Sequence, residues 1–511
     1  MDSEIKFQNK NPLFKNWFVL SIVQLVVLSL VSCKKLVETP IPTDQVAENG
    51  VYANDATAIA VLNQVYLAMN TDPFQGSGPY GSVSLFAGLA ADEYTLAPSI
   101  TRPSYVAYYQ NSLSQLTTAT ATGSEHWALL YNVIFKCNAA LKGLNSSGAD
   151  GLTSVVRRQL IGEADFMRAF FYFYLTNEYG DVPLALTTDP KVISQLPRTK
   201  QSSVYSQIIS DLEDAEAKLS ENYLDVTLLK STSERVRPTK WAATALLARV
   251  YLYTGDYAKS SSKATEVINN AMLFTLLPLN QVFLKNSQEA IFQIQPTDLG
   301  LNTQEAKSLV IPATGPGPSG RTDNPVYLSK TILNSFETGD QRAVYGNWID
   351  TVSYQKTPTV IDTVLFPYKY KINTSSGVAT AADLNEYFMV LRLGEQYLIR
   401  AEAKARLGSD PNGVVSDLNA IRQRAGLPAY TGPTDQASLL AAIMHERQVE
   451  LFSEWGHRWF DLKRFGKIDA VMSIVTPLKT NGNPWHSYQQ WFPIPIIDIQ
   501  KSPNLTQNSG Y

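Results

Sequence analysis

The chain has 511 residues, 44% of them hydrophobic and 17% charged, and its formal net charge is −3. This length and composition are typical of a globular protein with a large core, and a weakly acidic chain without a basic stripe argues against nucleic-acid binding. Cys33 and Cys137 are the only cysteines, which excludes a disulfide-rich scaffold.

A basic segment and an apolar run open the chain. Three lysines precede the apolar run 17–31, which ends in Leu30-Val31-Ser32-Cys33. A helix needs about 20 apolar residues to span a bilayer, so this pattern predicts a secretory signal peptide over 1–32. Its last four residues resemble a bacterial lipobox, whose cysteine thiol accepts a diacylglyceryl group. We expect a lipid anchor at Cys33, with an uncleaved anchor helix as the alternative; either way, the chain works outside the cytoplasm.

A tether over 33–50 is expected to lead into one large unit, 51–511. Apolar residues at helical spacing predict helices near 54–69, 122–141, 153–179, 204–219 and 238–253. Thr122 and Glu125 have the spacing of a capping box, which would open the second of these helices. Cys137 lies within that helix and is expected to be a buried small hydrophobe. The polar, aromatic-rich segment 71–123 is expected to be functional or disordered.

Two later segments resemble tetratricopeptide (TPR) helix pairs. The first runs from Ala248 through Gly255-Asp256-Tyr257 to Ala264, and 401–408 repeats the end of its first helix. Small residues let two antiparallel helices approach closely, and a glycine ends the first helix. Because the two segments are far more than about 34 residues apart, they are predicted to be pairs separated by insertions and not a tandem array.

The largest insertion, 271–385, differs in composition. It contains Gly315-Pro316-Gly317-Pro318 and the β-prone runs 290–294 and 359–365. The fold class we predict is mainly α. TPR-like pairs form a scaffold over 51–270 and 386–511, which carries a loop-rich, minor-β, ligand-binding lobe at 271–385.

Three carboxylates form the most conspicuous cluster of ionisable residues. Glu446, Glu450 and Glu454 are spaced four residues apart, with Arg447 and Arg458 close by, and are expected to form ion pairs along one helical ridge. The alternative, a glycosidase acid and base, needs two carboxyls about 5–10 Å apart across a sugar. Val449 replaces the second ligand of a zincin helix, so no metal site is expected there. Arg168 and Arg400 are predicted to bridge helices.

Five stretches of the chain resemble the SusD/RagB family. They are Trp127-x3-Tyr131-x2-Ile134-x3-Asn138; 168–184 with Tyr179-Gly180-Asp181-Val182-Pro183; 418–427; 446–466 (Glu-Arg-Gln-Val-Glu-Leu-Phe-Ser-Glu-Trp-Gly-His-Arg-Trp-Phe-Asp-Leu-Lys-Arg-Phe-Gly); and 491–495 with 504–511. The resemblance implies a lipid-anchored outer-membrane protein facing the cell surface, without catalytic residues or cofactors. It also implies a glycan or other nutrient as ligand and a SusC-like TonB-dependent β-barrel as partner.

Two other functions remain open. A TPR-type adaptor would bind only proteins and show no glycan affinity, whereas a surface glycoside hydrolase would turn its glycan over. The sequence does not name the glycan.

Ligand contacts are expected from aromatic residues in loops flanked by glycine and proline, because sugars stack their C–H faces on exposed rings. Within 74–109 and 321–354 the candidates are Tyr80, Tyr94, Tyr327 and Trp348, with Tyr94 and Trp348 preferred. Aromatic residues within amphipathic helices, such as Tyr131, are expected to belong to the core.

Overall fold

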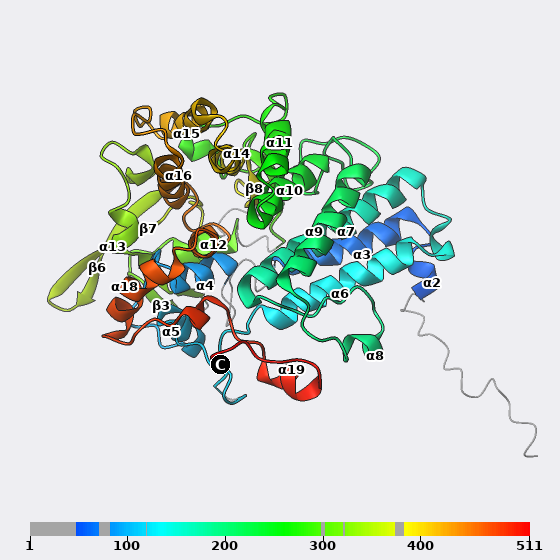
Figure 1. Ribbon diagram of the computed structural model, residues 1–511, viewed down its shortest axis with the longest axis horizontal. Helices are drawn as coiled ribbons and strands as arrows, with labels where there is room; N and C mark the ends of the chain where they lie inside the picture. Colours follow the sequence, from blue (N-terminus) through cyan, green and yellow to red (C-terminus); the bar gives the residue numbers. More distant parts are fainter. Residues whose placement is uncertain (1–47, 71–81, 119, 298–301, 320–321, 374–382) are drawn as a thin grey trace, which may run out of the picture. The chain divides into compact units, whose positions relative to one another are not determined.

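The computed structural model describes residues 48–70, 82–118, 120–297, 302–319, 322–373 and 383–511 (Figure 1). Cys33 and Tyr80 lie outside the described residues. Residues 51–511 form one unit, in which helices predominate, as predicted. None of the helices in the described ranges combines the length and apolar composition needed to cross a membrane.

The first half of the chain folds into a series of helices. They are α2 (Glu48–Val51), α3 (Asp55–Asn70), α4 (Val83–Ala90), α5 (Pro103–Tyr109), α6 (Trp127–Leu144), α7 (Ser154–Tyr179), α8 (Pro190–Ile193), α9 (Gln201–Lys218), α10 (Lys240–Thr254) and α11 (Tyr257–Ile268). Residues 169–179 of α7 are buried on every side, because α3, α6 and α9 cover it (Figure 1). Cys137 on α6 is buried and free, as predicted.

The capping-box prediction is wrong. Helix α6 begins at Trp127, and its N-cap residue, His126, makes no side-chain cap bond. Glu125 accepts instead from its neighbour, the Gly123 N–H (2.7 Å), and from the Tyr108 hydroxyl (3.0 Å). The segment 71–123 also contains two helices, α4 and α5, that its polar composition did not predict.

The second half of the chain supplies further helices, of which α14 packs on α10 and α11. They are α12 (Gln304–Leu309), α13 (Lys330–Leu333), α14 (Leu393–Leu407), α15 (Pro411–Arg424), α16 (Gln436–Glu450), α17 (His457–Arg464), α18 (Ile468–Thr480) and α19 (Ile496–Lys501). Helix α11 packs against α14, so the TPR-like pairs α10/α11 and α14/α15 are neighbours although an insertion separates them. Ala248, Ala264 and Ala403 share one buried cluster, which gives the close helix approach that small residues predict.

The strands form two-stranded antiparallel sheets within the described residues. They are β1 (Tyr94–Leu96), β2 (Ala290–Ile294), β3 (Gly317–Ser319), β4 (Thr322–Asn324), β5 (Val326–Leu328), β6 (Ile349–Thr357), β7 (Val360–Pro367) and β8 (Phe388–Arg392). The pairs are β1 with β5, β2 with β8, β3 with β4, and β6 with β7. Strands β1 and β8 lie outside the lobe (271–385), so its sheets are completed by residues from both flanks.

The C-terminal segment returns to the helices of the first half. Asp498 accepts a bond from the Trp127 indole (2.7 Å), and Arg198 donates to the Gln507 carbonyl (3.1 Å). The backbone N–H of Phe492 donates to the Glu178 carbonyl (2.8 Å). The last residues of the chain therefore cover the ends of α6 and α7.

Candidate functional site

Three tyrosines from different elements form a partly exposed row, which we call the tyrosine row: Tyr109 of α5, Tyr327 of β5 and Tyr354 of β6. In β5, Val326 and Leu328 are buried while Tyr327 is partly exposed, as strand alternation requires. Tyr327 lies opposite Thr95 of β1 in the strand register. The short sheet thus turns Tyr327 outward, beside the β6–β7 hairpin.

The row is electrically neutral. Partial burial raises the pKa of Tyr109, and the neighbouring Tyr327 raises it further. Burial also raises the pKa of Tyr327, and the neighbouring Tyr354 makes a smaller contribution in the same direction. The Tyr109 and Tyr327 hydroxyls therefore stay protonated at neutral pH, available both to donate and to accept hydrogen bonds.

The glycine-proline loop fixes Tyr354 from one side. Gly315 has φ +89°, and a Cβ at this position would lie 2.2 Å from the Tyr354 ring. Only glycine permits both this backbone conformation and this approach. The loop backbone therefore covers one face of the Tyr354 ring.

Polar groups of the hairpin border the row. Asp362 lies opposite Tyr354 in the strand register and accepts a bond from the Lys356 ammonium (2.8 Å), and both charged groups affect the pKa of Tyr327. On the α5 side, the Lys479 ammonium lies 5.1 Å from the centroid of the Tyr109 ring. Aromatic rings bordered by amine and carboxylate groups suit a ligand with apolar faces and many hydroxyls.

Of the four predicted ligand residues, Tyr327 is partly exposed in this row, and Tyr80 lies outside the described residues. Tyr94 is 1% exposed, so its prediction as an exposed stacking platform is wrong. It pairs with Leu328, next to the Thr95–Tyr327 pair in the register, and therefore points to the core face of the sheet.

Trp348 is also wrongly predicted as an exposed ring, since none of its side-chain surface is exposed. Its indole N–H donates to the Leu279 carbonyl (2.9 Å). The Lys369 ammonium lies 4.6 Å from the ring centroid, and the Arg424 guanidinium 5.0 Å. Trp348 is thus part of a buried cluster of charged residues. The partly exposed rings beside Tyr327 are instead Tyr109 and Tyr354, which were not among the candidates from the sequence.

The carboxylates of α16 and the turn after it belong to the same buried cluster. Glu446, Glu450 and Glu454 are at most 7% exposed. Arg342 bonds Glu446 (2.6 Å), and Arg392 bonds both Glu450 (2.6 Å) and Glu454 (2.7 Å). The prediction that these carboxylates form ion pairs is confirmed. Because they are buried and bonded to arginines, they do not form a catalytic pair that faces a sugar.

The partners in this cluster differ from those expected along one ridge. Arg447 pairs with Asp461 (2.7 Å) and Arg458 with Asp92 (2.7 Å), so the ridge is tied to other segments. Burial alone would raise the pKa of Glu450, but Arg424, Arg392 and Arg342 hold it well below its usual range.

The predicted helix bridges are present. Arg168 of α7 bonds Asp211 of α9 (2.8 Å), and Arg400 of α14 bonds Asp417 of α15 (2.9 Å).

Two family models match the chain. The model of the SusD family matches residues 334–511, and a model described as starch-binding associating with outer membrane matches residues 86–252. SusD-like protein P25 of Formosa agariphila is 24% identical, over 95% of this chain and 98% of that protein. The starch-binding protein SusD of Bacteroides thetaiotaomicron is 25% identical, over 71% of this chain and 74% of its own.

Solved structures share the fold. A SusD superfamily protein from Parabacteroides distasonis has a TM-score of 0.71 at 24% identity, covering 89% of this chain and 99% of that one. A laminarin-binding SusD-like protein has a TM-score of 0.69 at 23% identity, covering 90% of this chain and 100% of its own.

Proposed function

This chain belongs to the SusD/RagB family, and on that basis we propose that it is a lipid-anchored protein of the outer membrane that captures a glycan at the cell surface. It delivers the glycan to a SusC-like TonB-dependent barrel and performs no catalysis. The glycan binds at the tyrosine row (Tyr109, Tyr327 and Tyr354).

The tyrosine row is the observation that carries this proposal. A pyranose presents apolar C–H faces, which stack on a partly exposed ring, while its hydroxyls bond neighbouring polar groups. Tyr327 supplies such a ring, and the hairpin supplies the polar groups of Lys356 and Asp362 beside it. Relatives described as starch-binding and laminarin-binding favour a glucan among the possible glycans.

A binding role without turnover follows from where the carboxylates lie. Glu446, Glu450 and Glu454 are engaged by arginines in the core, so they are not available to a sugar. The hairpin carboxylate Asp362 is paired with Lys356, whose ammonium holds the pKa of Asp362 below its ordinary value. An acid near neutral pH is what a glycosidase needs, and this pair does not provide it.

Tyr327→Ala tests the site. Loss of one aromatic contact, about 0.5–1.5 kcal/mol, should weaken binding of maltohexaose or laminarihexaose roughly threefold to tenfold by calorimetry. Tyr257→Ala is the control, because Tyr257 is a partly exposed tyrosine on α11, outside the lobe.

An unchanged affinity with an intact thermal melt would remove Tyr327 from the site. A wild-type chain that binds no glycan would favour the adaptor function instead. Release of reducing ends by the purified chain would contradict the proposal that it is not an enzyme.

A further inference from the structure

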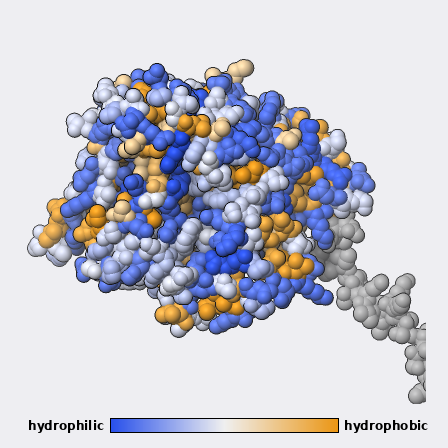
Figure 2. Space-filling view, viewed as in Figure 1, coloured by the Kyte–Doolittle hydropathy of each residue, from blue (hydrophilic) through white to orange (hydrophobic). Residues whose placement is uncertain are grey.

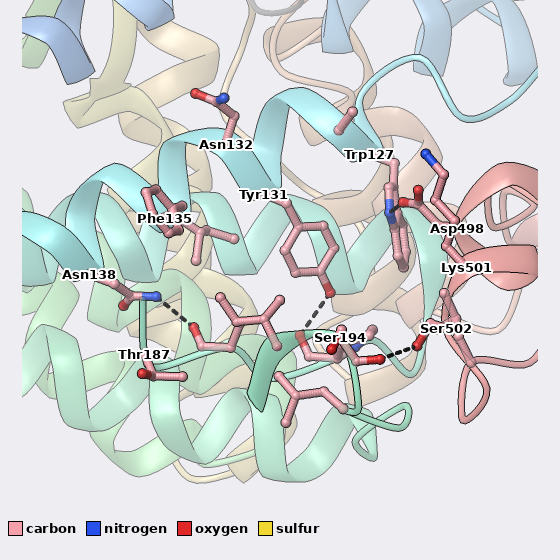
Figure 3. Close-up of a pocket in the computed structure, with 17 residues that line it drawn as sticks. Trp127, Tyr131, Asn132, Phe135, Asn138, Thr187, Ser194, Asp498, Lys501 and Ser502 are labelled. Carbon is pink, nitrogen blue, oxygen red and sulfur yellow. Dashed lines mark hydrogen bonds between the residues drawn. The ribbon is translucent and has the colours of Figure 1, made fainter. Parts of the chain in front are cut away.

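A groove runs along α6, on a different set of elements from the tyrosine row. Its cavity has a volume of about 460 Å³ and lies between α6, the segment 183–196 that contains α8, and α19 (Figure 3). This volume lies within the range of roughly 300–1,000 Å³ of small-molecule sites. The sequence analysis placed Tyr131 of α6 in the core, whereas the structure leaves it partly exposed at the border of this cavity.

One face of α6 forms the floor. Trp127, Tyr131 and Phe135 are spaced four residues apart and therefore line up along the helix. Trp127 is 3% exposed, whereas Tyr131 is partly exposed and Phe135 is 46% exposed. The open rings of the groove are thus Tyr131 and Phe135.

Hydrogen bonds tie the walls to this floor, as Figure 3 shows for Tyr131 and Asn138. The Tyr131 hydroxyl donates to the Pro183 carbonyl (2.8 Å), and the Asn138 amide donates to the Ala185 carbonyl (2.8 Å). At the other end, the Trp127 indole bonds Asp498 (2.7 Å). The groove is therefore formed before any ligand arrives, which lowers the ordering cost of binding.

The groove continues into a polar half. A second cavity of about 490 Å³ shares Asn138 and Thr187 with the first and extends to Lys142, Asn145 and Asp189. Charges of both signs border the two cavities, Asp498 with Lys501 in the first and Lys142 with Asp189 in the second. Such a lining favours a neutral ligand over an anionic or cationic polymer.

From these observations we propose that the α6 groove is a second binding site for a neutral oligosaccharide, which stacks on Phe135 and Tyr131 and extends toward Thr187 and Asn145. This inference rests on the proposed glycan-binding function. Two sites on one chain would hold a long glycan more firmly than either site alone.

A protein partner is the competing occupant. Hydrophobic surface is visible around α6 and α8 (Figure 2). Leu186, before α8, and Val192, within it, are exposed hydrophobic residues. A protein anchor, however, is usually received by a dry pocket enclosed by contacts that exclude water. The continuation of this groove into amide, hydroxyl and charged groups favours a hydroxylated chain.

The test uses the full-length chain in mild detergent, titrated by calorimetry with maltohexaose and with laminarihexaose. The variants are Phe135→Ala, Tyr327→Ala and the double variant. Leu407→Ala is the matched control, because Leu407 on α14 has the same 46% exposure as Phe135. We expect two binding events in the wild type, one of which becomes roughly threefold to tenfold weaker in Phe135→Ala. The control should retain both.

Each other outcome counts against a specific claim. If Phe135→Ala binds like the wild type while Tyr327→Ala loses binding, the second site is wrong and the proposed function stands. If Phe135→Ala abolishes binding and Tyr327→Ala does not, the groove is the glycan site and the tyrosine row is wrong.

A wild type that binds neither hexasaccharide overturns both proposals. If Phe135→Ala instead lowers recovery of a barrel partner and leaves the titrations unchanged, the groove is a protein-docking surface and this inference is wrong.

Discussion

Two buried carboxyl groups, Glu93 and Glu305, lie near the inward-facing ring of Tyr94. They are 1% and 2% exposed. Burial raises the pKa of Glu93 to about 8 and that of Glu305 to about 7. Both groups are therefore largely protonated in the folded protein at slightly acidic pH, where the unfolded chain has lost these protons.

This difference predicts how stability depends on pH. Above the ordinary pKa of 4.5, the folded state binds more protons than the unfolded state, so the free energy of unfolding falls as pH rises toward 7. Glu305→Gln removes the titrating group, so its stability relative to the wild type should grow between pH 5 and 7, by up to about 1.4 kcal/mol per pH unit. Urea unfolding at several pH values measures this.

For Glu305 the window ends near pH 7, because above this pH the folded state has also lost the proton. In the total stability, buried lysines act in the opposite direction above this pH. Burial lowers the pKa of Lys479 to about 7 and that of Lys369 to about 8, so losing their protons favours the folded state as pH rises further. Parallel pH profiles for Glu305→Gln and the wild type would contradict the assignment.

Individual ligand residues were the least predictable feature of the sequence. Tyr94 and Tyr327 both occur in polar segments, yet they point to opposite faces because Tyr94 pairs with Leu328 and not with Tyr327. That register joins strands more than two hundred residues apart, and no local pattern specifies it. Trp348 is buried by Lys369 and Arg424, which come from other segments further along the chain.

At the scale of elements, local signals predicted the TPR-like pairs well. Gly255 and Gly408 end α10 and α14 in the left-handed conformation, with φ of +81° and +69°. Such stops are encoded locally, because only glycine adopts this conformation without strain. The capping-box prediction for α6 failed because Glu125 bonds Gly123, which precedes α6, and Tyr108 of α5.

Gly408 offers a clean test of this explanation. Nothing lies within 4 Å of a Cβ added at this position, so Gly408→Ala introduces backbone strain without a steric clash. It should lower the free energy of unfolding by about 1–2 kcal/mol. Gly408→Asn should cost less, because asparagine tolerates the left-handed region. Equal losses for both variants in urea titrations would contradict the strain argument.

At the scale of the whole molecule, the sequence predicted the fold class and the family but not how the sheets close. The β-prone runs were expected at 290–294 and 359–365; β2 coincides with the first, and β7 (Val360–Pro367) begins one residue into the second and extends beyond it. The two strands differ in how far along the chain their partners lie. Strand β7 forms a local hairpin with β6, whereas β2 pairs with β8, which lies beyond the lobe. Hairpin turns leave a local signal, and distant pairing does not.

The lipid anchor is the prediction that concerns the whole chain. Cys33→Ala should lower the share of the protein that sediments with the outer membrane, because the variant has no thiol at position 33 to accept the lipid. Cys137→Ala is the control: Cys137 is buried in α6, so its loss should leave the fractionation unchanged. A Cys33→Ala chain that still sediments with the outer membrane would show that lipidation is not the anchor.

The return of the C-terminal segment to the first helices sets the order in which the molecule can be completed. Trp127 obtains its partner only when Asp498 has emerged, and Arg198 must wait for Gln507. A chain exported from its N-terminus therefore crosses the inner membrane with α6 and α7 still uncovered. The periplasm has to keep this long nascent polypeptide from aggregating until its final residues arrive, and only then does the native state become reachable.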